Sequence, residues 1–189
     1  MLYLVARMII CLTGMPGAGK GLVSEIARTK GIPVYVMGDV VREEATRRGL
    51  PHKPHILNAI AQELREKEGP AAVAKRIVSK IIESKSKIVL IDGVRSLYEI
   101  DVFRDYGDII IIAVHASPRT RFERLRKRNR PGDPKTWEEF VSRDFLELGF
   151  GIGNVIALAD YMIVNEEDKS KAIEYANKIL ERLVNIAQD

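Results

Sequence analysis

The stretch that decides the fold lies near the start of the chain and reads Met8-Ile9-Ile10-Cys11-Leu12-Thr13-Gly14-Met15-Pro16-Gly17-Ala18-Gly19-Lys20-Gly21. Its first six residues are rich in apolar and β-branched side chains and end at a glycine, which predicts a buried β-strand. Gly14 and Gly19 follow with four residues between them, and Lys20 comes directly after the second glycine. A helical pattern over about residues 20–30 is closed by Gly31. A strand, a glycine-rich turn with lysine and a helix, in this order, predict a loop that binds phosphate groups.

The residue types of such a loop follow from its chemistry. Backbone N–H groups turn inward toward phosphate oxygens, and glycines allow the backbone to approach them closely. Lys20 opens the helix, so its charge adds to the positive end of the helix dipole. A tight turn without a ligand is the alternative, but the position between strand and helix favours nucleotide phosphates. We expect these to be bound by Gly14, Met15, Pro16, Gly17, Ala18, Gly19, Lys20 and Gly21.

The remainder of the chain repeats the alternation of strand and helix. Four more apolar runs predict strands at residues 34–37, 87–93, 108–114 and 161–165. Helical patterns fill the segments between and after them, with breaks at 49–51, 69–70 and 129–135 and helix starts at Ser117-Pro118 and at the capping box Thr136–Glu139. Continuously apolar strands alternating with helices predict a five-stranded parallel sheet covered on both faces, an α/β fold of three layers. Residues 1–189 are expected to form one domain.

The composition excludes several classes of protein. A hydrophobic share of 46% argues against disorder, and 30% charged residues indicate a well-solvated surface. No stretch approaches 18 consecutive apolar residues, so no membrane partner is expected. The run Met1–Ala6 is cut short by Arg7 and lacks a small-residue cleavage site, which argues against a signal peptide. We expect a soluble cytoplasmic protein; its single cysteine, Cys11, is expected in the core.

Positive charge is concentrated in one segment. The formal net charge is +4, yet residues 119–130 alone hold seven basic side chains and one acidic, which leaves −2 for the rest of the chain. We expect this segment to meet something negative, although a solvated helix face is the plainer interpretation. Its basic residues are Arg119, Arg121, Arg124, Arg126, Lys127, Arg128 and Arg130.

Ligands of parallel sheets lie beyond the carboxyl ends of the strands. Asp92 stands at one such end, where an acidic side chain holds the hydration shell of Mg²⁺ in proteins with this loop. A capping aspartate is the alternative. The hydroxyl residue that usually follows the lysine and ligates the metal is replaced by Gly21, so Asp92 or waters are expected to hold the Mg²⁺.

Several short motifs resemble those of nucleoside monophosphate kinases, and the resemblance spans nearly the whole chain. The loop shares the Pro-Gly-x-Gly-Lys-Gly core of adenylate kinases, with Leu22 where they have threonine. Residues 38–42 resemble their Gly-Asp-x-x-Arg segment, and residues 92–95 resemble their Asp-Gly-x-x-Arg segment, shortened by one residue. The chain is similar above all to archaeal adenylate-kinase-related proteins, while residues 159–165 resemble the last strand of dephospho-coenzyme A kinases.

This resemblance implies a P-loop NTPase fold, an α/β/α sandwich with a helical acceptor-binding insertion at residues 38–84 and a short lid segment at 124–148. It implies ATP and Mg²⁺ as cofactors and a small-molecule phosphate acceptor as partner. Arg124 and Arg128 would contact the donor nucleotide, and Asp133 and Arg143 lie where the family closes its lid.

The acceptor side follows from the same resemblance. Arg42 would bind the phosphate of the acceptor, with Asp39 and Arg95 as further substrate-binding residues. The candidate catalytic residues are Lys20, Arg42, Asp92, Arg128 and Arg143.

Phosphoryl transfer to a nucleotide or related acceptor is the favoured hypothesis. The transferring group spreads negative charge over its oxygens, and arginines hold such groups with two hydrogen bonds each. A phosphate acceptor is already anionic and needs no strong base. A hydroxyl acceptor, as in dephospho-coenzyme A kinase, would need one; Asp39 is the best candidate unless it serves as a helix N-cap.

A non-catalytic nucleotide-binding or RNA-associated protein is the alternative from another class. The basic segment would then contact a nucleic-acid backbone, and the missing hydroxyl after Lys20 favours this hypothesis. A nucleic-acid partner is nevertheless not favoured, because Phe122 is the one aromatic residue of the basic segment, which is too few for stacking on the bases of single strands. The set of arginines around a shared site favours the kinase more strongly.

Other signals are expected to be structural. His52 and His55 lack an evident third ligand, so no metal site is predicted there. Residues 149–153 lack the spacing of a dinucleotide fingerprint and do not follow a strand; we interpret them as a flexible turn near the site. Trp137 is expected to pack against its neighbours.

Overall fold

Strand β1 (Met8–Thr13) lies at the centre of a five-stranded sheet in the computed structural model, which describes residues 7–166 and 168–188. The strands follow the order β2-β3-β1-β4-β5, and all neighbouring pairs are parallel. The other strands are β2 (Val34–Val36), β3 (Ile88–Asp92), β4 (Asp108–His115) and β5 (Tyr161–Val164). The predicted parallel sheet is confirmed, whereas the prediction for Met1–Ala6 lies outside the described residues.

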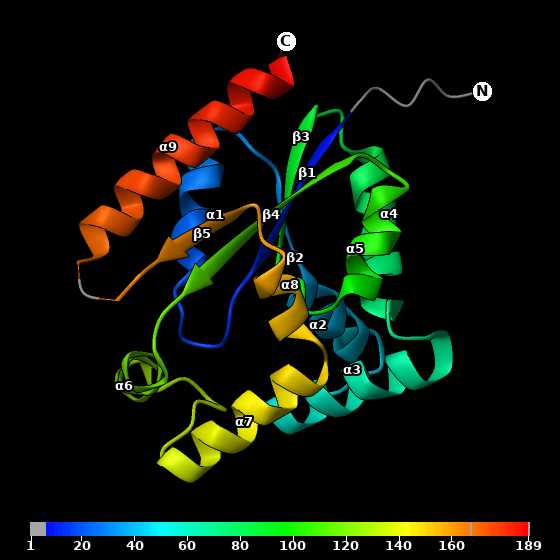
Figure 1. Ribbon diagram of the computed structural model, residues 1–189. Helices are drawn as coiled ribbons and strands as arrows, with labels where there is room; N and C mark the ends of the chain where they lie inside the picture. Colours follow the sequence, from blue (N-terminus) through cyan, green and yellow to red (C-terminus); the bar gives the residue numbers. More distant parts are fainter. Residues whose placement is uncertain (1–6, 167, 189) are drawn as a thin grey trace.

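Helices cover both faces of this sheet (Figure 1). Ile9 and Cys11 of β1 pack into one core cluster, and Ile10 and Leu12 pack into the other, because successive side chains of a strand point to opposite faces. The cluster around Ile10 is covered by α1 (Lys20–Thr29) and α9 (Lys169–Gln188). The cluster around Ile9 is covered by α2 (Met37–Arg47), α3 (Pro54–Glu68), α4 (Ala72–Glu83) and α5 (Leu97–Arg104). The result is the predicted three-layer α/β/α arrangement.

The remaining helices begin where the sequence predicts. Ser117 caps α6 (Pro118–Arg128), since its side chain accepts a hydrogen bond from the backbone N–H of Thr120. Thr136 forms the predicted capping box at the start of α7 (Trp137–Gly149). None of the helices in the described part of the chain combines the length and the apolar character that crossing a membrane requires.

Two local interpretations are wrong. The segment 149–153 is a turn only at residues 150 and 151: α7 extends to Gly149, and a further helix, α8 (Ile152–Ala157), begins after Gly151. Ile152 and Val155 are buried, so core packing holds this short helix in place. Asp39 is not a helix N-cap, because α2 already starts at Met37 and Asp39 lies in its first turn.

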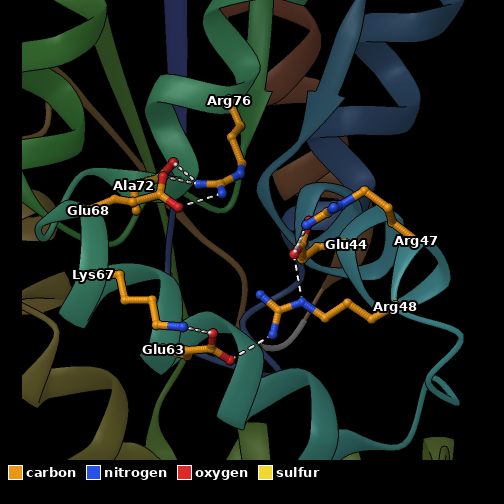
Figure 2. Close-up of polar contacts among 8 residues, drawn as sticks. All are labelled: Glu44, Arg47, Arg48, Glu63, Lys67, Glu68, Ala72 and Arg76. Atoms are coloured by element: carbon orange, nitrogen blue, oxygen red, sulfur yellow. Dashed lines mark hydrogen bonds and ion pairs between the residues drawn. The ribbon is translucent and has the colours of Figure 1, made fainter.

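Ion pairs tie together the three helices inserted between β2 and β3 (Figure 2). Arg48, directly after α2, donates to Glu44 one turn earlier and to Glu63 of α3, at 2.6 Å in both cases. Arg76 of α4 pairs with Glu68 at the end of α3, at 2.6 Å. Because Glu44 is buried, its arginine partners compensate the cost of removing its charge from water.

The decrease in the free energy of unfolding at acidic pH is expected to depend on Glu44. Hydrogen bonds from Arg47 and Arg48 lower the pKa of Glu44 from 4.5 to about 2. A carboxyl group with a lower pKa in the folded chain stabilises the fold above its unfolded pKa and loses that contribution as the pH falls. We expect the free energy of unfolding to fall between about pH 4.5 and 2, and to fall less in Glu44→Gln. Urea unfolding at pH 7, 4.5 and 3 measures this, and equal losses in the two proteins would contradict it.

Candidate functional site

The phosphate-binding loop runs from the end of β1 to the start of α1 and depends on its glycines. Gly14 has a φ of 143°, and a Cβ there would lie 2.4 Å from the carbonyl oxygen of Val114. Gly19 has a φ of 106°, and a Cβ there would lie 2.2 Å from Nδ2 of Asn165. Both positions therefore require glycine for conformation and for space.

Two side chains that the sequence analysis did not single out hold this loop. Nδ2 of Asn165, at the end of β5, donates to the carbonyl oxygen of Ala18 at 2.8 Å. Arg121 of α6 donates to the carbonyl oxygen of Pro16 at 3.2 Å and to that of Ala116 at 3.1 Å. The loop is thus fastened to β5 and α6 as well as to β1.

Arg121 is buried, although the sequence places it in the basic segment. Its guanidinium forms two hydrogen bonds with Asp144 of α7, at 2.8 and 2.5 Å, and lies over the ring of Phe140. The sequence signal for this burial is its spacing from Leu125, because residues four apart share one face of a helix and Leu125 is buried. Arg121 is therefore a structural member of the basic segment.

Substitution within the loop should separate the roles of its glycines. Gly19→Ala is expected to lower the affinity for ATP about tenfold or more, because a positive φ costs an L-residue roughly 1–2 kcal/mol and the new Cβ also meets Asn165. Gly21→Ala is the matched control, since a Cβ at Gly21 meets nothing within 4 Å. Calorimetric titration with ATP measures both variants, and equal affinities would contradict the prediction.

A cavity of about 450 Å³ opens over the loop. It receives side chains from the carboxyl end of β3, from α6 and from α7. The helices α6 and α7 lie beyond the carboxyl end of β4 in Figure 1. The side chains that line it are mostly basic. Its lining includes Gly14, Pro16, Gly17, Gly19, Lys20, Gly21, Asp92, Arg95, Arg124, Arg128, Arg130, Arg143 and Glu147.

Lys20 reaches back over the loop, and its Nζ donates to the carbonyl oxygen of Gly14 at 2.5 Å. Burial lowers the pKa of Lys20, while the carboxylate of Asp92 acts in the opposite direction. Bound phosphate oxygens would replace the carbonyl as partners of this amine and would favour its charged form.

Asp92 is held beside the loop at the end of β3. Oγ of Ser24, on the first turns of α1, donates to Oδ2 of Asp92 at 2.7 Å. The turn after Asp92 is fixed to β1, because the N–H groups of Gly93 and Val94 both donate to the carbonyl oxygen of Leu12. The carboxylate therefore has a defined orientation toward the cavity that it lines.

The arginines of α6 and α7 are held by backbone and by one acid. Arg124 donates to the carbonyl oxygens of Asn165, at 2.7 Å, and Glu166, at 3.0 Å. Nε of Arg128 donates to Oδ2 of Asp133 at 2.9 Å, and Arg143 lies 3.6 Å from the same carboxylate. Asp133 thus joins an arginine of α6 to an arginine of α7, and both arginines line the cavity.

Arg95 also lines the cavity and contacts two buried acids. Its backbone N–H donates to Glu99 at 2.7 Å, and its Nε lies 3.0 Å from Oε2 of Glu147. Glu99 is also 3.5 Å from Arg65 of α3. Burial raises the pKa of Glu99, and the backbone of Arg95 opposes that effect. Arg95 is the predicted acceptor-side residue that the structure brings into the cavity.

Two predicted site residues lie elsewhere. Asp39 and Arg42 border a separate hollow on α2, together with Thr46, Arg47 and His52. Nε of Arg42 donates to Asp39 at 3.0 Å, so these two side chains bind each other. Met15 and Ala18 belong to the loop but are not among the residues that line the cavity.

Comparison with known sequences identifies relatives of the chain. Residues 13–141 match the AAA domain family. The chain is 60% identical over 177 residues to a UPF0200 protein of Hyperthermus butylicus, covering 94% of this chain and 95% of that protein. It is 45% identical over 180 residues to a UPF0200 protein of Methanocaldococcus jannaschii, covering 94% and 91%.

Comparison with solved structures supports the fold. Shikimate kinase from Bacteroides thetaiotaomicron superposes with a TM-score of 0.60 at 21% identity, covering 95% of this chain and 99% of that one. This likeness shows the fold alone, and it confirms the P-loop kinase-like α/β fold that the sequence predicts. The chain belongs to the UPF0200 protein family, and its phosphate-binding loop is part of an AAA domain.

Proposed function

We propose that the protein is an ATP-dependent phosphotransferase of the nucleoside monophosphate kinase type. It moves the γ-phosphate of ATP to a nucleotide or a related small acceptor that carries phosphate. The observation that carries this proposal is the lining of one cavity, where the loop and Lys20 face arginines from three separate elements. A protein that only binds nucleotide needs the loop, whereas phosphoryl transfer also needs cations around the oxygens where charge develops.

ATP fits the loop by its phosphates. The inward N–H groups and the start of α1 favour the β-phosphate, and Lys20 reaches the terminal phosphates. Arg124 contacts the donor nucleotide from α6. Arg128 and Arg143 approach from the two sides of the 129–136 loop and stabilise the transferring group.

The residues present fit a Mg²⁺ ion. Mg²⁺ is commonly bound through one or two carboxylates together with phosphate oxygens and water, and Asp92 is a carboxylate with a fixed orientation beside the loop. Gly21 supplies no hydroxyl, so Asp92 would hold the ion directly or through water. When bound, the metal neutralises charge on the β- and γ-phosphate oxygens.

The distribution of the basic segment disfavours a nucleic-acid function. Arg121 is buried, and Arg124, Arg128 and Arg130 line the cavity. Phe122 forms a T-shaped pair with Trp137, with ring centroids 5.4 Å apart, rather than a free stacking surface. Three of the seven basic residues therefore lie where a small phosphate ligand is proposed to bind, and a fourth is buried. The remaining basic residues are Arg119, Arg126 and Lys127.

Product formation tests the proposal. The protein is incubated with ATP, Mg²⁺ and AMP, CMP, UMP, GMP, dephospho-coenzyme A or no acceptor, and products are separated by ion-exchange chromatography. We expect ADP to form together with one phosphorylated acceptor, and both to disappear in Lys20→Ala. Tight binding of ATP without transfer to any acceptor or to water would exclude the kinase, and RNA binding would then be measured as a function of salt.

A further inference from the structure

Glu147 is an acidic side chain in a cavity otherwise built for anions. It lies near the end of α7, its side chain is 9% exposed, and it borders the same cavity as Lys20 and Asp92. It also lies close enough to Lys20 for its charge to favour the protonated amine, as that of Asp92 does. Glu147 therefore lines the cavity in which Lys20 is proposed to hold the terminal phosphates of ATP.

One oxygen of Glu147 is left without a hydrogen bond. Within residues 7–166 and 168–188, its buried Oε2 accepts none. Nε of Arg95 is 3.0 Å away, but the pair does not have the geometry of a hydrogen bond. A buried carboxylate oxygen without a donor is costly, so a donor from a bound ligand would remove that cost.

We infer that Glu147 is a catalytic residue that accepts the proton of a hydroxyl, and that the oxygen attacking the γ-phosphate is a hydroxyl oxygen of the acceptor. This deepens the proposed function and rests on it. A carboxylate next to the terminal phosphate repels an anionic nucleophile, whereas a neutral hydroxyl brings the missing donor and a proton to give up. The acceptor can still carry a phosphate elsewhere.

The step balances without a further reactant. The O–H bond of the acceptor breaks, and its proton passes to the carboxylate of Glu147. The acceptor oxygen forms a bond to the γ-phosphorus, and the bond from that phosphorus to the β–γ bridging oxygen breaks. ADP leaves with the electron pair of that bond, and the product is a phosphate monoester.

This reassigns the base that a hydroxyl acceptor needs. The sequence pointed to Asp39, whose carboxylate binds Arg42 and borders another hollow. Glu147 lies in the cavity of Lys20. Its place in the cavity was not evident from the sequence, because it lies on an amphipathic helix that carries several other acidic residues.

The type of phosphate bond in the product, phosphomonoester or phosphoanhydride, tests whether the acceptor oxygen is a hydroxyl oxygen. Wild-type protein is supplied with ATP, Mg²⁺ and, separately, AMP, the four common nucleosides, dephospho-coenzyme A or no acceptor, and phosphorus NMR identifies the product. AMP offers both kinds of oxygen, so a phosphoanhydride and a phosphomonoester can be told apart on one molecule. We expect a phosphomonoester, or inorganic phosphate where water is the only hydroxyl. A phosphoanhydride would overturn the inference and leave the proposed function standing.

Variants then test the residue. Glu147→Gln is expected to lower this transfer at least about 100-fold with ATP affinity unchanged, since general-base catalysis contributes roughly 10²–10⁴-fold. Glu138→Gln, exposed at the other end of α7, is the matched control. Glu147→Asp keeps a carboxylate should the amide fail to fold, and is expected to retain more activity than the amide.

Four other outcomes overturn the inference. Full activity in Glu147→Gln would exclude a base at this position. A loss restored by more Mg²⁺ would assign Glu147 to the metal, and a parallel loss of ATP affinity would make it a support for Arg95. Absence of any transfer by the wild type, to water included, would overturn the proposed function and this inference together.

Discussion

Replacing Lys20 with alanine is expected to lower phosphoryl transfer from ATP about 1000-fold. One preorganised donor aimed at developing charge is typically worth about 10²–10³ in rate, and a lysine adds a full positive charge to that effect. Nζ of Lys20 is held over the loop by the carbonyl oxygen of Gly14 in the same cavity that the arginines line. Initial rates of ADP formation at saturating ATP measure the change.

The fold of Lys20→Ala should be intact. Burial lowers the pKa of Lys20, which means that the folded chain bears a cost for its charge, and alanine removes that cost. The midpoint of thermal unfolding is therefore not expected to fall. Lys85→Ala, exposed in the loop before β3, is the control for loss of a lysine in general. A variant that retains a tenth of the wild-type rate would rule out the central role of this amine.

Replacing Asp144 with alanine is expected to have the largest effect on stability. Arg121 is 5% exposed in its side chain and would remain buried without its carboxylate partner. Breaking a buried ion pair on one side typically costs about 3–5 kcal/mol, which in a domain of this size lowers the midpoint of thermal unfolding by about 10 °C. Differential scanning calorimetry measures the shift.

An exposed ion pair provides the comparison. Asp101 lies 3.6 Å from Arg104 on α5, and both side chains are more than half exposed. Asp101→Ala is expected to cost less than about 1 kcal/mol, because water screens such pairs. A similar loss in the two variants would show that burial of the Arg121–Asp144 pair does not set its contribution.

The sheet and the loop could be predicted because their signals are local. Apolar runs of strand length marked β1, β3 and β4. Gly14 follows the first and Asp92 ends the second, and both of these residues line the cavity. Lys20 and Asp92 were predicted for the same reason, since their neighbours in sequence fix them at strand ends. Short β2 was predicted to within one residue.

The other walls of the cavity depend on contacts between distant segments. Arg121 and Arg128 look alike in a basic segment, and only the packing of α7 buries the first against Asp144 and leaves the second facing the cavity. Asn165 was predicted as the end of a strand, and its bond to Ala18 spans 147 residues of sequence. No local pattern encodes such a contact.

Resemblance to a family was a mixed guide to individual residues. The short motif around Asp92 placed Arg95 in the cavity, although its spacing departs from the family pattern. The closer match at Asp39 and Arg42 leads to a separate hollow, where these residues pair with each other. Matching residue types set a position along the chain, while the geometry of α2 decides which space the side chains enter.

The placement of Asp144 between Arg143 and Glu147 on one helix limits how the protein can open and close around a nucleotide. α7 cannot swing away from the cavity without breaking the buried Arg121–Asp144 pair, which fastens α7 to α6, and Arg121 in turn holds the phosphate-binding loop. α6 is likewise tied to β5 through Arg124. We therefore expect movement of the proposed lid segment 124–148 to centre on the loop at 129–136, so that product release needs only a few residues to move while α6 and α7 stay in place.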